Sequence, residues 1–357
     1  MSNVIRLTLP TQRQSRQRRL ATLIESFAGH RRADGDVFWL KENAELLNIL
    51  ECTGAVPAAE ALVPHEGFYA SAEQKLGFFP QYYRFILSLC LDLEDLGLPG
   101  SKGAALVQWA AREGLVQTEM SDLQRAEARR LMLRRGVDPL PEDTGLEARL
   151  RGFVGRPGTF AMPNRKAAYE LTHIVFYLSE YGRHDPALSA EALTSLEFAG
   201  ILAYLDQNAD LLAEICIALR FAGRVPSPVW EGWLARQTRD FVIFSGPQVD
   251  VADDYHDFLV CNWAMAVAGR KPFSVPVPEG RVAFCRAAGP GPLRHISECM
   301  FRLEDRRSDD WHAMRPHVEA GLSEQGQHIL NAAQQSSDRF EEFFAGFARA
   351  RLCGVAS

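Results

Sequence analysis

The sequence predicts an all-α protein built from repeated α-hairpins, and two observations support this prediction. Apolar residues recur at intervals of three and four along about twelve segments, which is the spacing of one helical face. In addition, residues 41–57 resemble residues 206–226, and residues 83–97 resemble residues 169–182. Repeated hairpins stack into an open solenoid or close into a double-layered ring. We expect the ring, an α/α toroid, with a helical bundle or a solenoid as alternatives.

Composition places the chain among ordinary globular proteins. Of its 357 residues 47% are hydrophobic and 24% charged, which suits one large domain or two smaller ones. Apolar runs of about 18 residues are absent, so no membrane span is expected. The seven cysteines are scattered and form no CxxC motif, which excludes a thiolate metal site. Residues 1–19 lack the apolar core of a secretory signal, so we expect a cytoplasmic protein.

The first expected region, residues 1–138, is helical and begins with a basic arm. A short strand is expected at residues 4–9. Helices are expected over residues 12–30, 37–54, 103–113 and 121–135, and within residues 72–97. Residues 1–32 contain seven arginines and only one acidic residue, Glu25. This arm is either solvated or contacts an acidic partner. Because the whole chain carries a net charge of −6, nucleic acid is not expected as the main partner.

A Gly/Pro/Arg-rich loop is expected at residues 139–163, followed by a helical region, residues 164–357, that carries the candidate site. The two helical regions form separate domains or one continuous domain. Helices are expected over residues 164–182, 187–205, 206–223 and 253–269, with three or four more after residue 280. Residues 228–244 are expected to be helical or partly extended.

The helix expected at residues 164–182 is the clearest feature of the chain. Its apolar face consists of Ala167, Leu171, Ile174, Val175 and Leu178. Its other face carries a stripe of polar residues, Lys166, Glu170, His173, Tyr177 and Glu180. A helix that is otherwise apolar is normally buried. The stripe therefore indicates an inner helix that faces a polar cavity.

Glu170 and His173 form an ExxH motif on this helix. Residues three apart share a helical face, so the two side chains could bind one metal ion or share one proton. Helical-bundle di-iron proteins carry this motif twice, and a second copy on a suitable helix is absent here. The motif therefore indicates a single site, or a structural hydrogen bond.

Asp210 and Glu214 share a face of the next apolar helix. Asp210 also suits the N-terminal end of a helix dipole. Together with His173 and His256, these carboxylates would provide a divalent-metal site or an acid–base site. The expected catalytic residues are Glu170, His173, Tyr177 and Glu214. The expected metal ligands are His173, Asp210, Glu214 and His256.

Asp253, Asp254 and Asp257 form a DDxxD motif that resembles the magnesium-binding motif of class I terpene synthases. This resemblance implies an all-α magnesium enzyme with an apolar cavity. The second metal motif of that family is approximated only from Glu304 onwards, which is too early in the chain, and His312 stands where its final Glu is required. The first two aspartates also suit a helix N-cap.

Arg156 and Arg165 lie among glycines just before the central helix, and Asn164 is the expected N-cap of that helix. Arginines beside a helix N-terminus suit an anionic cofactor. The motifs GxxxxGK[ST], GxSxG, HExxH and GxGxxG are absent, which argues against P-loop, nucleophile-elbow, zincin and dinucleotide sites.

The segment LTHIVFYLSEYG at residues 171–182, followed by the DLLAE helix and a YH-bearing helix, resembles an uncharacterised bacterial all-α family. The resemblance covers about residues 160–270 and implies no activity.

The sequence leaves three functions open. The first is an enzyme that acts on a small molecule through an acid–base or divalent-metal site in a helical cavity. The second is a helical scaffold or binding protein, whose polar stripe is a buried hydrogen-bond network. The third is the terpene-synthase-like magnesium enzyme.

Overall fold

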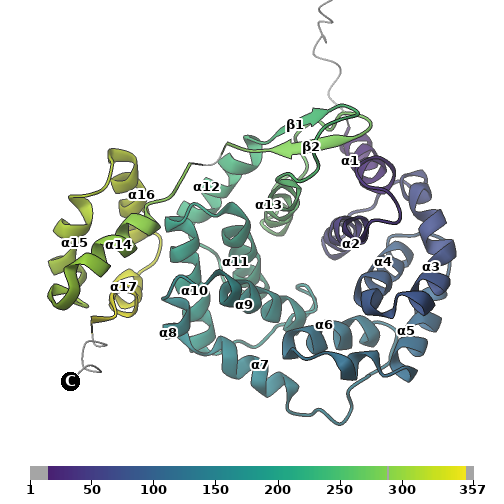
Figure 1. The fold of residues 1–357 in the computed structure, drawn as a ribbon, viewed down its shortest axis with the longest axis horizontal. Helices are drawn as coiled ribbons and strands as arrows, with labels where there is room; N and C mark the ends of the chain where they lie inside the picture. The colour runs from purple at the N-terminus through teal and green to yellow at the C-terminus, as the bar shows by residue number, and fades with distance from the viewer. Residues whose placement is uncertain (1–14, 288, 351–357) are drawn as a thin grey trace, which may run out of the picture.

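The chain folds into a double ring of helices with a small helical bundle attached to its side (Figure 1). This computed structural model describes residues 15–287 and 289–350, and the strand expected at residues 4–9 lies outside these ranges. The described residues contain seventeen α-helices and one two-stranded sheet. The all-α prediction is confirmed.

Six helices form the inner layer of the ring. They are α2 (Val37–Cys52), α4 (Tyr83–Asp95), α6 (Asp122–Leu133), α9 (Arg165–Leu178), α11 (Ala209–Phe221) and α13 (Tyr255–Val267). Each inner helix contacts the next, and α13 contacts α2, so the layer is closed. This arrangement is the predicted α/α toroid, and a closed layer of this kind excludes an open solenoid.

The outer layer consists of the helices that precede each inner helix in the chain. They are α1 (Arg16–Glu25), α3 (Glu66–Phe78), α5 (Lys102–Arg112), α7 (Leu146–Val154), α10 (Ala190–Leu205) and α12 (Pro228–Arg239). Short 3-10 turns at Ala59–His65, Pro80–Tyr82 and Leu115–Thr118 and a π-helical turn at Ser26–His30 connect helices of the ring, and a further 3-10 turn, Glu304–Arg306, lies in the C-terminal part. Because outer and inner helices alternate along the chain, all six inner helices run in the same direction.

The two internal resemblances in the sequence correspond to equivalent places in this ring. Residues 41–57 and 206–226 contain most of α2 and all of α11, and residues 83–97 and 169–182 contain α4 and most of α9. All four are inner helices. Their shared apolar pattern follows from burial on nearly every side: in α11 every residue from the first through Leu219 is buried.

Asparagine side chains set the starts of two inner helices. The Asn164 side chain accepts a hydrogen bond from the backbone N–H of Ala167 at the start of α9, as predicted. Asn208 caps α11 in the same way through the N–H of Leu211. These caps place Asp210 in the first turn of α11 and His173 in the middle of α9.

The segment 139–163 differs from the expected loop. It contains α7 and the short α8 (Pro157–Phe160), and the ring continues through it because α6 contacts α9. Leu146, Leu150 and Val154 are buried along one face of α7. The expectation was wrong because Gly152 lies within α7 and Gly158 within α8, and neither glycine interrupts its helix.

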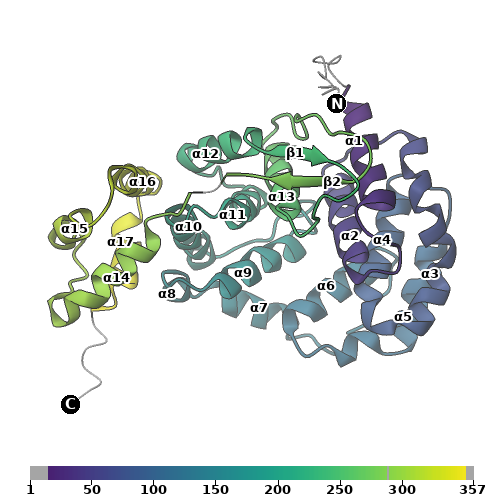
Figure 2. The same ribbon diagram turned by 45° about the horizontal axis from the view of Figure 1, so that its top comes forward.

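A two-stranded antiparallel sheet lies beside α1 and α13 at one edge of the ring (Figure 2). Strand β1 (Val242–Ser245) pairs with β2 (Val282–Cys285), with Val242 opposite Cys285. The extended character expected near residue 244 is therefore present.

Four C-terminal helices form a bundle outside the ring (Figure 1). They are α14 (Leu293–Leu303), α15 (Trp311–Glu319), α16 (Glu324–Gln335) and α17 (Phe340–Ala348). Helices α16 and α17 contact α10, and α16 also contacts α12. None of the helices in the described ranges combines the length and the apolar character needed to cross a membrane.

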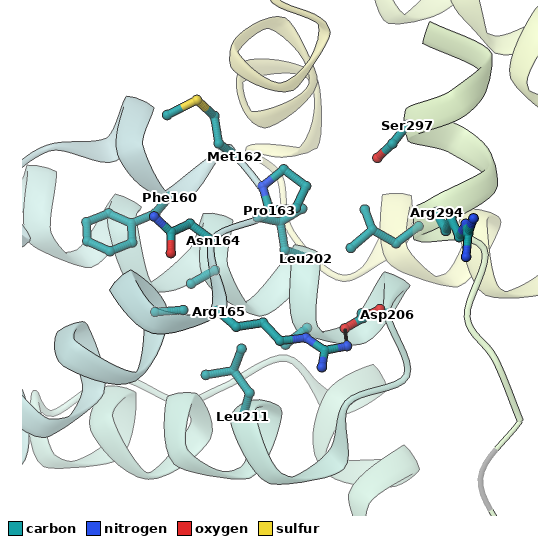
Figure 3. A pocket seen from close by; sticks show the side chains of 14 residues that line it. Phe160, Met162, Pro163, Asn164, Arg165, Leu202, Asp206, Leu211, Arg294 and Ser297 are labelled. Carbon is teal, nitrogen blue, oxygen red and sulfur yellow. Dashed lines mark hydrogen bonds and ion pairs between the residues drawn. The ribbon is translucent and has the colours of Figure 1, made fainter. Parts of the chain in front are cut away.

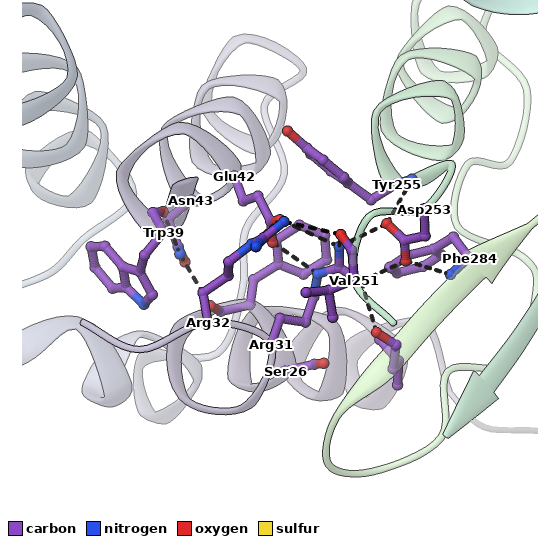
Figure 4. A network of polar contacts seen from close by, with 12 residues as sticks. Ser26, Arg31, Arg32, Trp39, Glu42, Asn43, Val251, Asp253, Tyr255 and Phe284 are labelled. Atoms are coloured by element: carbon purple, nitrogen blue, oxygen red, sulfur yellow. Dashed lines mark hydrogen bonds and ion pairs between the residues drawn. The ribbon is translucent and has the colours of Figure 1, made fainter. Parts of the chain in front are cut away.

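A buried ionic network closes the ring between its first and last hairpins (Figure 4). The Arg31 guanidinium donates to Glu42 at 2.9 Å and to Asp253 at 2.8 and 2.9 Å, and to the carbonyl of Val282 at 2.7 Å. The ring of Phe27 lies 4.9 Å from the same guanidinium. We call Arg31, Arg32, Glu42 and Asp253 the closure network. It joins segments more than 200 residues apart.

Candidate functional site

A cavity of about 210 Å³ lies within the inner layer, and all six inner helices contribute to its wall. Its polar side chains are Lys41, Glu45, Asn48, Arg84, Ser88, Glu127, His173, Tyr177, Tyr181, Glu214 and His256. Its apolar wall includes Phe85, Phe176 and Trp263. His173, Phe176 and Tyr177 of α9 line this cavity, in agreement with the sequence prediction that α9 faces a polar cavity.

Glu214 and His256 line this cavity, and Asp210 lies beside them in a geometry that suits a metal ion. One ligand atom from each side chain lies within 4.8 Å of the others. Asp210 and Glu214 are one turn apart on α11, and His256 comes from the first turn of the neighbouring α13. The Nε2 atom of His256 lies 3.1 Å from Oδ1 of Asp210.

Each of these three side chains is held in place by a second residue. The Tyr169 hydroxyl donates to Oδ2 of Asp210 at 2.5 Å, and the Thr172 hydroxyl donates to Oε2 of Glu214 at 2.5 Å. Nδ1 of His256 contacts Oε1 of Glu45. Hydrogen-bonded partners of this kind orient ligands in metal sites, where a histidine usually donates its second ring N–H to a carboxylate.

Two buried carboxylate oxygens at the site accept no hydrogen bond from the described residues. They are Oδ1 of Asp210 and Oε2 of Glu45. The 3.1 Å contact between Asp210 and His256 is an ion pair without hydrogen-bond alignment. A buried carboxylate oxygen without a donor is costly. The arrangement therefore favours a cation at this place.

The charges of the site shift the pKa of both histidines and of Asp210. Burial lowers the pKa of His256, but the carboxylates of Glu45 and Asp210 outweigh burial and raise it to about 12. For His173 the surrounding protein also lowers the pKa, and Glu214 outweighs it, so that the pKa lies above its usual value. Burial raises the pKa of Asp210, and contact with His256 and Tyr169 leaves it below its usual value. The cluster thus attracts positive charge.

His173 lies beside the cluster and is open to the cavity. Its Nε2 atom is 3.5 Å from Oε1 of Glu214, and its side chain is 40% exposed, whereas that of Glu214 is 3% exposed. The ring of Tyr177 lies 6.1 Å from the His173 ring and also lines the cavity. Both side chains can therefore contact a molecule in the cavity.

Glu170 does not join the cluster. It is half-buried, it is not part of the cavity wall, and it makes no hydrogen bond or ion pair with any described residue. The ExxH pair predicted between Glu170 and His173 is not formed, because His173 contacts Glu214 on the adjacent helix instead.

Arg156 and Arg165 also lie away from the cluster. Arg156 is exposed, and Arg165 lines a separate pocket of about 420 Å³ between α8–α10 and α14 (Figure 3). There its guanidinium donates to Asp206 at 2.6 Å. The structure therefore separates these two arginines from the predicted metal ligands.

The DDxxD aspartates are engaged in contacts within the protein. Asp253 belongs to the closure network, and Asp254 accepts a hydrogen bond from the backbone N–H of Arg286 at 3.0 Å. Asp257 pairs with the Arg286 guanidinium at 3.1 Å. These contacts favour a structural role for the motif.

Several arginines of residues 15–32 are likewise engaged in contacts within the protein. Arg31 and Arg32 belong to the closure network, Arg19 donates to the carbonyl of Phe273, and Arg18 pairs with Glu279. The remainder of the predicted basic arm, residues 1–14, lies outside the described residues.

Sequence reasoning missed Glu45, Lys41, Tyr169 and Thr172. For Glu45 a signal was present, since residues 43–47 read NAELL and residues 208–212 read NADLL. This alignment pairs Glu45 with Asp210, and in the structure these two carboxylates lie on opposite sides of the His256 ring. No signal of this kind marks Lys41, Tyr169 or Thr172.

Comparisons with known proteins add a family and no named relative. Neither the curated proteins nor the solved structures gave a match to the chain. A family model described as "Domain of unknown function (DUF6902)" matches residues 1–350. The chain therefore belongs to the DUF6902 family.

Proposed function

We propose that this protein is an enzyme that binds a divalent cation through Asp210, Glu214 and His256 and acts on a small molecule in the axial cavity. His173 lies beside the cation as the proton-transferring residue. The single observation that carries the proposal is the convergence of three oriented ligands, one of them with a buried oxygen that lacks a hydrogen-bond donor.

The donor set favours zinc or a similar first-row ion over magnesium or calcium. Imidazole nitrogen suits zinc, copper, iron and nickel, whereas magnesium and calcium prefer oxygen ligands alone. Three protein ligands leave coordination positions for water or substrate, as in catalytic zinc sites. Glu45 contacts Nδ1 of His256, so that Nε2, once it has released its proton, is the ring nitrogen that would bind the cation.

The positions of the cation ligands and of His173 indicate the kind of reaction. A bound divalent cation polarises a substrate oxygen or lowers the pKa of a bound water. His173 is exposed to the cavity and is paired with Glu214, which favours its protonated form, so it can donate a proton to the substrate during the reaction. Water activation of this kind serves hydrolysis or hydration. As location we propose the cytoplasm, where the scattered cysteines stay reduced.

The test is the metal content of purified protein after dialysis against zinc and then against buffer. We expect one zinc per chain in the wild type and in Glu170→Gln, and a strong loss in Asp210→Asn. Glu170 is the matched control because it is an acidic residue of the neighbouring α9 without contacts. Equal zinc contents in the wild type and Asp210→Asn would contradict the proposal. A folded wild type without zinc would favour the scaffold function, with the cluster as a buried hydrogen-bond network.

A further inference from the structure

One cationic side chain on the wall of the axial cavity has no counter-charge. Lys41 is exposed, lines the cavity, and makes no hydrogen bond, ion pair or ring contact with any residue in the described ranges. It lies one turn before Glu45 on α2, so both side chains point from the same helical face. The ammonium group of Lys41 therefore belongs to the same cavity wall as Glu214 and His256, and no residue in the described ranges pairs with it.

Arg84, the other strong cation on the wall, is already engaged. Its Nε donates to Glu119 at 3.0 Å, and its Nη1 contacts Glu127. These two carboxylates neutralise Arg84 and hold it against α6. Lys41 therefore differs from Arg84 in being available to a molecule that enters the cavity.

The direction of the inner helices adds to this positive character. All six run the same way, and Lys41, Arg84 and His256 lie in the first two turns of their helices. Three of the six inner helices, α2, α4 and α13, thus contribute N-terminal turns with a partial positive charge to the cavity wall. These partial positive charges and the ammonium group of Lys41 both attract an anion.

We infer that the enzyme acts on small molecules that carry a phosphate or carboxylate group, and that Lys41 binds this group while the cation binds the reacting oxygen. The inference rests on the proposed metal site. A cavity of about 210 Å³ is below the range of about 300–1,000 Å³ that holds drug-sized ligands, which limits the substrate to a small metabolite. The aromatic wall of Phe85, Phe176 and Trp263 contacts its apolar part.

The experiment titrates inorganic phosphate, and separately acetate, into zinc-loaded full-length protein by calorimetry, after the zinc content of each sample is measured. We expect Lys41→Met to bind the preferred anion at least tenfold more weakly than the wild type, with an unchanged zinc content. Lys41→Arg should restore binding to within threefold. Lys166→Met is the matched control, since Lys166 is an exposed lysine of inner helix α9 outside the cavity wall, and it should bind as the wild type does.

The outcomes separate this inference from the proposed function. Tighter binding of phosphate indicates phosphate-bearing substrates, and tighter binding of acetate indicates carboxylates. Zinc-loaded wild type that binds neither anion, or binds them as Lys41→Met does, overturns the inference and leaves the metal site standing. A wild type that takes up no zinc overturns the proposed function at the first step, before any anion is added.

Discussion

Two ionic clusters lie between α2 and its neighbours, and they differ in how completely their polar atoms are paired. In the closure network, Arg31, Glu42 and Asp253 are at most 4% exposed at their side chains, and none of their polar atoms lacks a partner. In the axial cluster, which consists of Glu45, Asp210, Glu214 and His256, Oδ1 of Asp210 and Oε2 of Glu45 accept no hydrogen bond from the residues that the structure describes. In the closure network the polar atoms are paired within the folded protein, whereas the axial cluster has carboxylate oxygens that a bound cation could neutralise.

This difference separates a structural role from a functional one. A fully paired buried network holds two elements in one arrangement, and removal of one partner leaves an unpaired buried charge. A cluster with oriented but unpaired oxygens on a cavity wall has a charge that a ligand can neutralise. The following substitutions test the distinction, from the largest expected effect to the smallest.

Arg31→Met should destabilise the protein most. It leaves Asp253 buried without its counter-charge and Glu42 with Arg32 as its remaining partner, which costs about 3–5 kcal/mol of the free energy of unfolding. Urea unfolding followed by circular dichroism measures this loss. Arg18→Met is the control, because Arg18 and Glu279 form an exposed pair, and its loss should be below about 1 kcal/mol. Equal stability of the two variants would contradict a role for the network in ring closure.

His65 provides a pH test beside the closure network. Burial lowers the pKa of His65 to about 4, against an ordinary value of 6.5. Its Nε2 bonds Oδ1 of Asn43 at 2.8 Å, and its Nδ1 is buried without a partner among the described residues. The neutral ring is therefore favoured in the folded state. Its contribution to stability is complete above pH 6.5 and is lost as the pH falls towards 4.

The expected loss is about 3 kcal/mol between these pH values, because each pKa unit corresponds to about 1.36 kcal/mol. Unfolding midpoints in urea at pH 7, 6, 5 and 4.5 measure it. His65→Gln keeps a donor for Asn43 but does not titrate. The free energy of unfolding of this variant should therefore fall with pH by about 3 kcal/mol less than that of the wild type. A variant with the slope of the wild type would show that His65 does not carry the effect.

Glu214→Gln should separate binding from stability in the axial cluster. Gln can still accept the hydrogen bond from Thr172, so the free energy of unfolding without metal should change by less than about 1 kcal/mol. Zinc affinity should fall by about 100-fold or more, because a charged ligand is lost. Competition with a fluorescent chelator measures the affinity, with Glu170→Gln as control. A large loss of stability with unchanged zinc affinity would make the cluster a structural network.

Glu45→Gln should give the smallest effect of the series. Glu45 contacts Nδ1 of His256 and orients the ring without being a ligand itself. Loss of such a partner typically lowers metal affinity by about 10–100-fold. The same chelator competition measures the change, which should be smaller than that of Glu214→Gln. An effect larger than that of Glu214→Gln would place Glu45 among the ligands.

Sequence periodicity was sufficient for most of the fold because helical faces are local properties. The apolar faces of α9 and α11, their asparagine caps and the one-turn spacing of Asp210 and Glu214 depend on residues a few positions apart. Segment 139–163 was misjudged because the glycines within α7 and α8 look the same in sequence as glycines within a loop.

The partners within the site depended on contacts between helices. Glu170 and His173 share a helix, yet His173 lies beside Glu214, 41 residues further along the chain. Glu45 and His256 are 211 residues apart and meet only because α13 closes the ring against α2. Periodicity reports which face of a helix a residue occupies, but not which other face it meets.

The sequence by itself therefore predicted an all-α fold of repeated hairpins, with a ring preferred over a bundle or a solenoid, and five residues of the candidate site, His173, Tyr177, Asp210, Glu214 and His256. The tertiary structure alone decided that Glu45, Tyr169 and Thr172 orient these side chains, and that Lys41 stands unpaired on the same cavity. The physical reason is that hydrogen bonds and ion pairs between helices act over about 3 Å, and only the closed packing of the six inner helices brings these atoms within that distance.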